Sequence, residues 1–199
     1  MIKNIFTIFI FSLLFVACST NELSKQEKEV QRQEVSKELL SDISYILFLL
    51  KQKDLDNLNS RFINPKIGLY EVYKSDIENK ITFKHSYEID EIVDIIDSFE
   101  IKQEIIIFNC SPYNDAFYGW NKDGTFLTTQ IKPYLSQIIQ EQNKITPNKY
   151  KTEELANIAL IEKTSYELIV TNNVIFYLTK IDNLWYITLI DKIKTDCSK

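Results

Sequence analysis

Apolar and polar positions alternate along the chain with periods that separate helical from extended segments. From Glu29 to Lys53, apolar residues recur at spacings of three and four, as on one face of an α-helix. These residues are Val35, Leu39, Ile43, Ile46, Leu47 and Leu50. Asp54 can cap a second, shorter helix, which Asn64-Pro65 ends. Its inward residues are expected to be Leu55, Leu58 and Phe62.

The middle of the chain predicts strands around one further helix. The β-rich segment that follows Gly68 and the segment at 81–83 are expected to pair as strands. The continuous apolar run at 104–110, bounded by Pro112, predicts a buried strand. A helix is expected between them, with Ile89, Ile92, Val93 and Ile96 inward and Asp90, Glu91, Asp94 and Asp97 outward. At this spacing the acids form a solvated face, and we expect no metal site there.

The second half of the chain predicts a turn, two helices and a β-meander. Residues 121–124 form the expected turn of a hairpin or tight loop. Thr128 or Thr129 can cap a helix that tolerates Pro133 in its first turn and buries Ile131, Leu135, Ile138 and Ile139. A brief helix is expected to start at Thr152. Strands at 166–171, 174–181 and 184–190, separated by turns at Asn172-Asn173 and Asp182-Asn183, make the meander.

Helices first and long antiparallel strands last predict an α+β domain with N-terminal helices packed on a curved, mainly antiparallel sheet. The long first helix, the short helix led by Asp54 and the final hairpin at 182–186 together resemble the NTF2-like (cystatin-related) fold. That resemblance implies a sheet that curls into a cone. Enzymes of this family use a His-Asp or Asp-Arg pair in the cone, and the sequence has no such pair at a matching position. The resemblance therefore implies a fold and not an activity.

The N-terminus carries the pattern of an export signal. Lys3 precedes an apolar run from Ile5 to Val16, which is shorter than the roughly 20 residues needed to span a bilayer and suits a signal peptide. The run ends in Ala17-Cys18 and resembles a bacterial lipobox, with Phe15 where leucine is usual. The resemblance implies cleavage before Cys18 and acylation of its sulfur, including palmitate. An ordinary secretory signal with an incidental cysteine and a short buried helix are the alternatives.

These features predict that the protein is located in the bacterial cell envelope. We expect a signal peptide at 1–17, a lipidated Cys18 with a polar spacer at 18–27, and one α+β domain at 28–199. Two or more acyl chains hold a protein stably at a membrane. Ser19 after the cysteine favours the outer membrane, on its periplasmic or surface side. The mature chain also resembles uncharacterised bacterial lipoproteins; the motifs shared with them are Asn64-Pro65 with Gly68 and Tyr70, Ser111-Pro112-Tyr113, and Trp120 with Asp123-Gly124.

Composition and charge narrow the classes of partner. Hydrophobic residues make up 45% of the chain and charged residues 26%, which is globular rather than disordered composition. The formal net charge of −5, with acids and bases interspersed, offers no basic surface for a phosphate backbone. We therefore expect no nucleic-acid partner. The expected partners are the membrane, through the lipid anchor, and an envelope protein, peptide or glycan.

Few residues are candidates for chemistry. The chain has no Gly-x-Ser-x-Gly elbow, no Gly-rich phosphate loop and no Cys-x-x-Cys, and it calls for no cofactor. His85 is the only histidine and the weak candidate for catalysis or, with Glu88, for metal binding; a surface or hydrogen-bonded structural role is the alternative. Cys110 and Cys197 predict a disulfide in an oxidising compartment. Two free cysteines are the alternative.

Aromatic side chains gather in one segment with short polar neighbours. They are Tyr113, Phe117, Tyr118 and Trp120. Such rings suit recognition of a peptide, sugar or lipid, because each combines a flat apolar face with a polar edge or tip. The alternative is that they cover a sheet edge as a small satellite core.

Two hypotheses for function follow. The first is a membrane-tethered, non-enzymatic binding or interaction domain, which predicts an apolar or aromatic cleft without perturbed acids. The second is an NTF2-like binder of a small ligand, or an enzyme, that uses a pocket His, Asp or Glu. It predicts a titratable side chain in an enclosed pocket.

Overall fold

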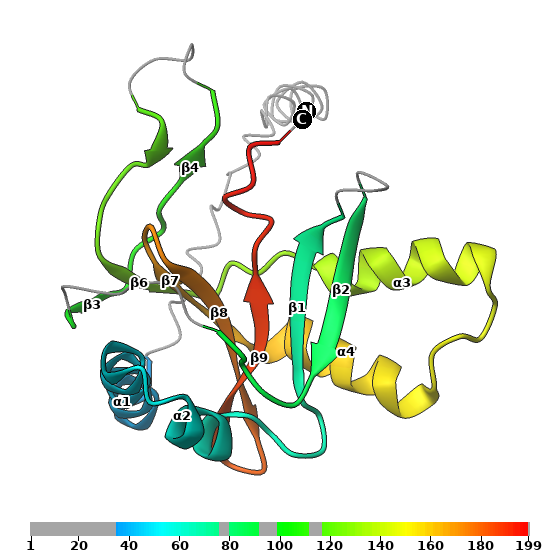
Figure 1. The fold of residues 1–199 in the computed structure, drawn as a ribbon, viewed down its shortest axis with the longest axis horizontal. Helices are drawn as coiled ribbons and strands as arrows, with labels where there is room; N and C mark the ends of the chain where they lie inside the picture. Colours follow the sequence, from blue (N-terminus) through cyan, green and yellow to red (C-terminus); the bar gives the residue numbers. More distant parts are fainter. Residues whose placement is uncertain (1–34, 76–79, 92–98, 112–116, 199) are drawn as a thin grey trace, which may run out of the picture. The chain divides into compact units, whose positions relative to one another are not determined.

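The computed structural model describes residues 35–75, 80–91, 99–111 and 117–198, which belong to one compact unit that begins at Val35. Cys18 and the predicted export signal lie outside the described residues. The elements, in chain order, are α1 (Lys37–Gln52), α2 (Leu55–Phe62), β1 (Leu69–Lys74), β2 (Ile81–Ser86), β3 (Ile101–Lys102), β4 (Phe108–Asn109), β5 (Gly119–Trp120), β6 (Thr125–Thr128), α3 (Tyr134–Ile145), α4 (Thr152–Thr164), β7 (Tyr166–Val170), β8 (Val174–Ile181) and β9 (Leu184–Asp191) (Figure 1).

Within the described residues, seven strands form one mainly antiparallel sheet in the order β2-β1-β9-β8-β7-β6-β3. β1 runs parallel to β9 and β3 runs parallel to β6, whereas the other neighbouring pairs are antiparallel. β4 and β5 form a separate two-stranded sheet. Residues 105–111 and 117–121, which carry these two strands, are called the arm below. The predicted α+β class with a mainly antiparallel sheet is confirmed.

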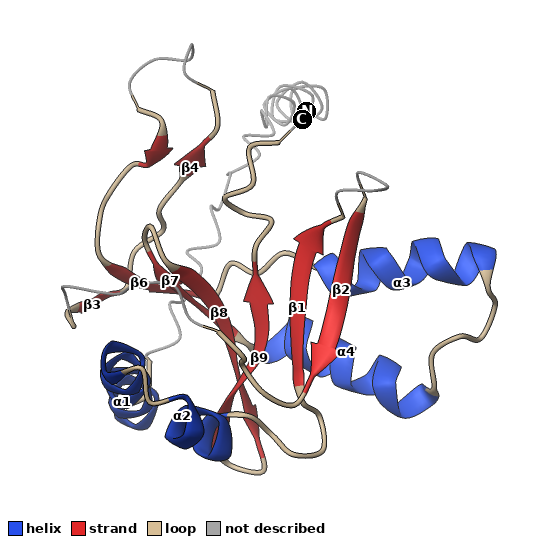
Figure 2. Cartoon of the chain, viewed as in Figure 1, coloured by secondary structure: helices blue, strands red, loops and turns tan. Residues whose placement is uncertain are grey.

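Helices cover both faces of the large sheet (Figure 2). α1 and α2 pack on one face, where Phe176 and Leu178 of β8 are buried. α3 and α4 pack on the other face, where Ile175 and Tyr177 of the same strand are buried. This alternation follows from the two-residue period of a strand. The sheet is not closed, and the described part of the chain shows no NTF2-like cone.

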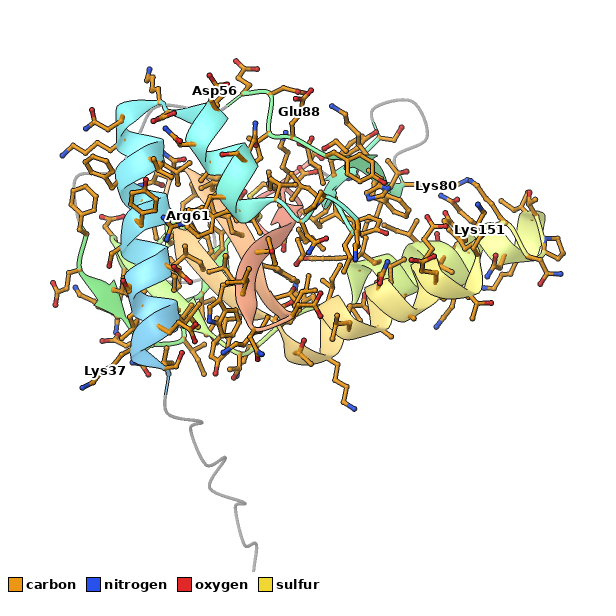
Figure 3. All side chains as sticks on the ribbon, turned by 90° about the horizontal axis from the view of Figure 1, so that it is seen from below. Lys37, Asp56, Arg61, Lys80, Glu88 and Lys151 are labelled. Carbon is orange, nitrogen blue, oxygen red and sulfur yellow. A yellow bond between two sulfur atoms is a disulfide. The ribbon has the colours of Figure 1, made fainter. Side chains whose placement is uncertain are left out.

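Capping groups explain where α1 and α2 begin and end. The Ser36 hydroxyl accepts a hydrogen bond from the Leu39 amide at 3.1 Å, and Asp54 accepts one from the Asn57 amide at 3.2 Å. Lys53 ends α1 in the left-handed conformation, with φ 56°. Arg61 of α2, labelled in Figure 3, contributes to the contact between the two helices. Its guanidinium lies over the Tyr45 ring of α1, 4.7 Å from the ring centroid. Both predicted helices are confirmed over the described residues.

The turn before β1 requires glycine. The Asn64 carbonyl accepts from the Gly68 amide at 2.8 Å, while the Asn64 side chain accepts from two further amides, those of Lys66 and Ile67. Gly68 has φ +73°, and a Cβ at this position would lie 2.5 Å from the Ser86 carbonyl oxygen. Only glycine fits both the conformation and the space. The Asn-Pro-x-x-Gly signal in the sequence therefore marks a tight turn between α2 and the sheet.

The C-terminal meander is confirmed, and its turns have a physical cause. Asn172, Asp182 and Asn183 all have positive φ, between 49° and 66°. Asn and Asp tolerate this conformation better than other non-glycine residues, and it matches the twist of tight hairpins. The two turns fix the registers of β7 with β8 and of β8 with β9.

The prediction of a buried strand at 104–110 is wrong. Only two residues of this run, Phe108 and Asn109, form a strand, and Ile105 and Ile107 are each 59% exposed. Ile106 is buried, so the run alternates instead of being buried on both sides. When every position of a run is apolar, the sequence does not show which side chains are buried and which are exposed. Here the run leaves the large sheet and forms part of the arm.

Three smaller predictions also need correction. β5 and β6 flank the expected turn at 121–124 but do not pair as a hairpin, because β5 pairs with β4 and β6 with β7. α3 begins after Pro133 with no side-chain cap, not at Thr128 or Thr129. α4, expected to be brief, has 13 residues. The helix expected around Ile89–Ile96 lies largely outside the described residues, although Ile89 itself is buried.

Candidate functional site

A cleft of about 500 Å³ is lined by residues of the arm, of the turn between β7 and β8, and of residues 192–198. Figure 1 shows where these parts of the chain lie in the fold. Residues 192–198, which follow β9, are called the C-terminal segment below. Clefts of this size hold small organic ligands. The lining residues come from at least six separate parts of the chain: Glu71, Ile89, Glu91, Phe108, Trp120, Val170, Asn172, Asn173, Val174, Ile175, Phe176, Ile190, Asp191, Lys192 and Thr195.

The floor of the cleft is apolar because it is an uncovered part of the sheet face on which α1 and α2 pack. Val170, Phe176 and Ile190 belong to the core cluster of that face, and Val174 packs against it. Phe176 and Ile190 reach the cleft from adjacent antiparallel strands, where they are partners in register. The cleft therefore continues the hydrophobic core outward.

One wall of the cleft is aromatic. Phe108 of β4 and Trp120 of β5 are partners across the arm, and their rings meet edge to face with centroids 5.1 Å apart. The Asn121 amide donates to the Ile107 carbonyl at 3.0 Å, and the Asn121 side chain accepts from the Ile107 amide at 2.9 Å. These bonds extend the pairing of the arm by one step and hold the two rings in place.

A disulfide joins the arm to the C-terminal segment. Cys110 and Cys197 are bonded, with their Cα atoms 5.3 Å apart, and are separated by 87 positions in sequence. This is the pairing that the cysteine count favoured. Cys110 is two residues from Phe108, and Cys197 is two residues from Thr195, both of which line the cleft. The bond therefore connects two walls of the cleft covalently.

Three of the four charged residues in the lining lie on the same side of the sheet as the apolar floor. The Lys192 Nζ lies 2.8 Å from Glu71 Oε1, and both side chains reach solvent. Glu91 is exposed. Asp191 is different: because its neighbour Ile190 points to the α1–α2 face, the Asp191 side chain points to the opposite one. The rim of the cleft thus carries two carboxylates and one ammonium group.

The Asp191 carboxylate belongs to a buried polar cluster under α3. Its Oδ1 accepts from the Ile193 and Lys194 amides at 2.8 and 2.9 Å. Glu167 of β7, 1% exposed, receives the Lys194 ammonium on both oxygens, at 2.7 and 2.6 Å. Burial raises the pKa of both carboxyls, and the Lys194 charge opposes that rise. This cluster fastens the C-terminal segment to the sheet.

Sequence reasoning missed the buried cluster, although a signal was present. Glu167 follows Tyr166 in a strand whose next three residues are apolar and buried. A lone acid in such a run requires a partner if it is buried. The partner, Lys194, lies 27 residues further along the chain, so the sequence does not identify it.

Of the four aromatic residues proposed as a binding surface, three are described, and the structure places one of these three in the cleft. Trp120 lines the cleft. Phe117 is half-buried, and its carbonyl accepts from the Asn109 side chain at 2.8 Å. Tyr118 is 64% exposed and does not line the cleft. Tyr113 lies outside the described residues. Phe108, which sequence reasoning had assigned to a buried strand, is the second aromatic residue of the cleft.

His85 has structural contacts and does not line the cleft. Its Nε2 donates to the Ile67 carbonyl at 2.7 Å, and its ring stacks on Tyr70 with centroids 4.5 Å apart. Burial raises the pKa of Tyr70 to about 12, so this phenol is neutral at physiological pH. His85 therefore supports the turn at Gly68. Among the described residues, no three His, Cys, Asp or Glu side chains lie close enough together to hold a metal ion.

Comparisons with protein families, with curated proteins and with solved structures find no match to this chain. Within the described residues, no helix has both the length and the hydrophobicity required to cross a bilayer.

Proposed function

We propose that this protein is a membrane-tethered lipoprotein of the bacterial cell envelope that binds a ligand in the cleft without catalysing a reaction. The observation that carries the binding role is the cleft itself, in which an apolar floor and two aromatic rings meet under walls joined by a disulfide. Rigid apolar and aromatic walls with a few polar groups at the rim are typical of small-ligand sites.

The lipobox-like segment supports the tether. An acylated Cys18 would leave 16 residues between the anchor and Val35, where the described unit begins. An extended chain covers at most about 3.5 Å per residue, so this spacer could reach on the order of 50 Å. A disulfide also fits an exported protein, because disulfides persist in oxidising compartments. A relationship of this domain to the NTF2-like fold is also part of the proposal.

A second candidate, an enzyme or a small-ligand binder that uses a titratable pocket residue, has one observation in its favour. Glu71 and Glu91 line the cleft, and Glu71 is paired with Lys192. A general acid or base must lie within hydrogen-bond reach of its substrate, and a carboxylate in a cleft can meet that requirement. His85, the only histidine of the chain, is not part of the cleft lining.

The proposal predicts that tethering and binding can be separated by two substitutions in the full chain. Cys18→Ala should abolish acylation, detected by mass spectrometry, and release the protein from the membrane fraction. Val174→Trp should keep the protein at the membrane but fill the cleft, so that a component of the native envelope that co-purifies with the wild type is lost. Leu184→Trp, at an exposed strand position, is the matched control.

Two results would contradict the proposal. If the wild-type protein stays in the membrane fraction although its N-terminus carries no acyl group, the lipid tether is excluded. Recovery of the same envelope component with Val174→Trp as with the wild type would exclude the cleft. Circular dichroism of each variant controls for the fold.

A further inference from the structure

The lining of the cleft is selective as well as apolar. Val174, Phe176 and Ile190 give the floor no hydrogen-bonding side chain, so the inner part of a ligand must be apolar to replace the water there. Polar side chains of the lining surround this floor: Asn172 on the turn, Lys192 and Thr195 on the C-terminal segment, and the acids Glu71 and Glu91. A ligand that fits both parts has an apolar body and one polar end.

Charge at the rim selects the sign of that polar end. Glu71 and Glu91 contribute two negative charges to the lining on the floor side, and Lys192 contributes one positive charge. The Lys192 ammonium already lies at the Glu71 carboxylate, and Glu91 has no ion pair with any described residue. An anionic ligand end would be repelled by the Glu91 carboxylate, whereas a cationic end would be attracted to it.

The aromatic wall favours the same sign. A ring face carries negative partial charge and attracts cations, most strongly for tryptophan. Trp120 and Phe108 both line the cleft, and their edge-to-face contact fixes the orientation of each ring relative to the other. An ammonium group entering the cleft thus meets favourable groups at the carboxylates and at the rings.

From these observations we infer that the ligand is an amine: an apolar chain or ring that lies on the floor and carries a protonated amino group at Glu91. The inference rests on the proposed function, since it names the ligand class of the same cleft. It also assigns Glu91 as the residue that discriminates an ammonium from a carboxylate.

Three probes of matched size test this assignment: phenethylamine, phenethyl alcohol and hydrocinnamate. The full-length Trp185→Phe protein in lipid nanodiscs leaves Trp120 as the only tryptophan, and its fluorescence reports binding. We expect phenethylamine to bind about fivefold more tightly than the alcohol, as one exposed ion pair provides, and hydrocinnamate to bind more weakly than both. Glu91→Gln should remove this preference, and Glu88→Gln, an exposed acid outside the lining, should keep it.

The outcomes separate the two proposals. Equal affinity for the three probes, or an unchanged preference in Glu91→Gln, would overturn the amine assignment and leave the binding cleft intact. No fluorescence response to any probe would overturn both. Trp120→Phe, which retains Trp185, should give no response; a full response there would show that the probes bind elsewhere and would also overturn both.

Discussion

Lys194→Met is expected to lower the free energy of unfolding by about 3 kcal/mol at neutral pH, because removing one partner of a buried ion pair leaves an uncompensated charge. Glu167 is buried on β7, and Lys194 bonds to both of its oxygens. Methionine replaces the length of lysine without its charge. Urea denaturation followed by circular dichroism measures the difference.

The effect should shrink as the pH falls. Burial raises the pKa of Glu167 above its ordinary value, and without Lys194 that pKa should rise further. The folded variant then takes up a proton more readily than the unfolded chain, so acidification stabilises it relative to the wild type. The other titratable groups around Glu167 are Asp191 of β9, Tyr134 of α3, Tyr177 of β8 and Lys132 before α3.

The matched control is Lys180→Met, which breaks the exposed ion pair of Lys180 with Glu38. An exposed pair contributes at most about 1 kcal/mol, so this variant should unfold close to the wild type at every pH. Two results would show that the Glu167 cluster does not hold the C-terminal segment. Lys194→Met could lower the free energy of unfolding by no more than Lys180→Met does, or its effect could be the same at neutral pH and at pH 4.5.

Replacing both Cys110 and Cys197 with serine should lower the free energy of unfolding by about 2–4 kcal/mol. The disulfide closes a loop of 87 positions, and long loops gain the most from closure because the unfolded chain loses more freedom. Denaturation with and without a reductant measures the effect. The wild type should fall to the stability of the double variant when reduced, and the double variant should not respond to the reductant.

This disulfide prediction has a clear counter-result. Equal unfolding midpoints for the oxidised wild type and the double variant would contradict it, as would alkylation of Cys110 in the native protein without a reductant. Cys18 lies outside the loop and serves as an internal reference for alkylation in an unprocessed chain.

The sequence predicted those elements whose signals are local. The capped helices and the final meander depend on periodicity and on turn residues such as Asn172 and Asp182, which act within a few positions. Which face of a sheet a helix covers depends on the whole topology. The apolar stripe of α3 predicts burial, but it does not show that this burial is on the face opposite α1.

The cleft was only partly predictable for the same reason. Trp120 was a candidate because aromatic residues cluster around it, but its partner Phe108 lies in a run that looked like a core strand. The floor comes from β7, β8 and β9, and the acids Glu71 and Glu91 come from segments far from them in sequence. Only the fold brings these residues together. The disulfide was expected from the number of cysteines, and the fold supplies the short distance between Cys110 and Cys197.

Site-specific photo-cross-linking in the cells that produce this protein tests most directly whether the cleft binds a ligand. A benzophenone amino acid at position 120 places the reactive group in the cleft, and the same group at Ile145, which is exposed at the end of α3, is the control. We expect a discrete adduct from position 120 that is absent from position 145 and is lost when Val174→Trp is added. No adduct from position 120, or identical adducts from both positions, would contradict it.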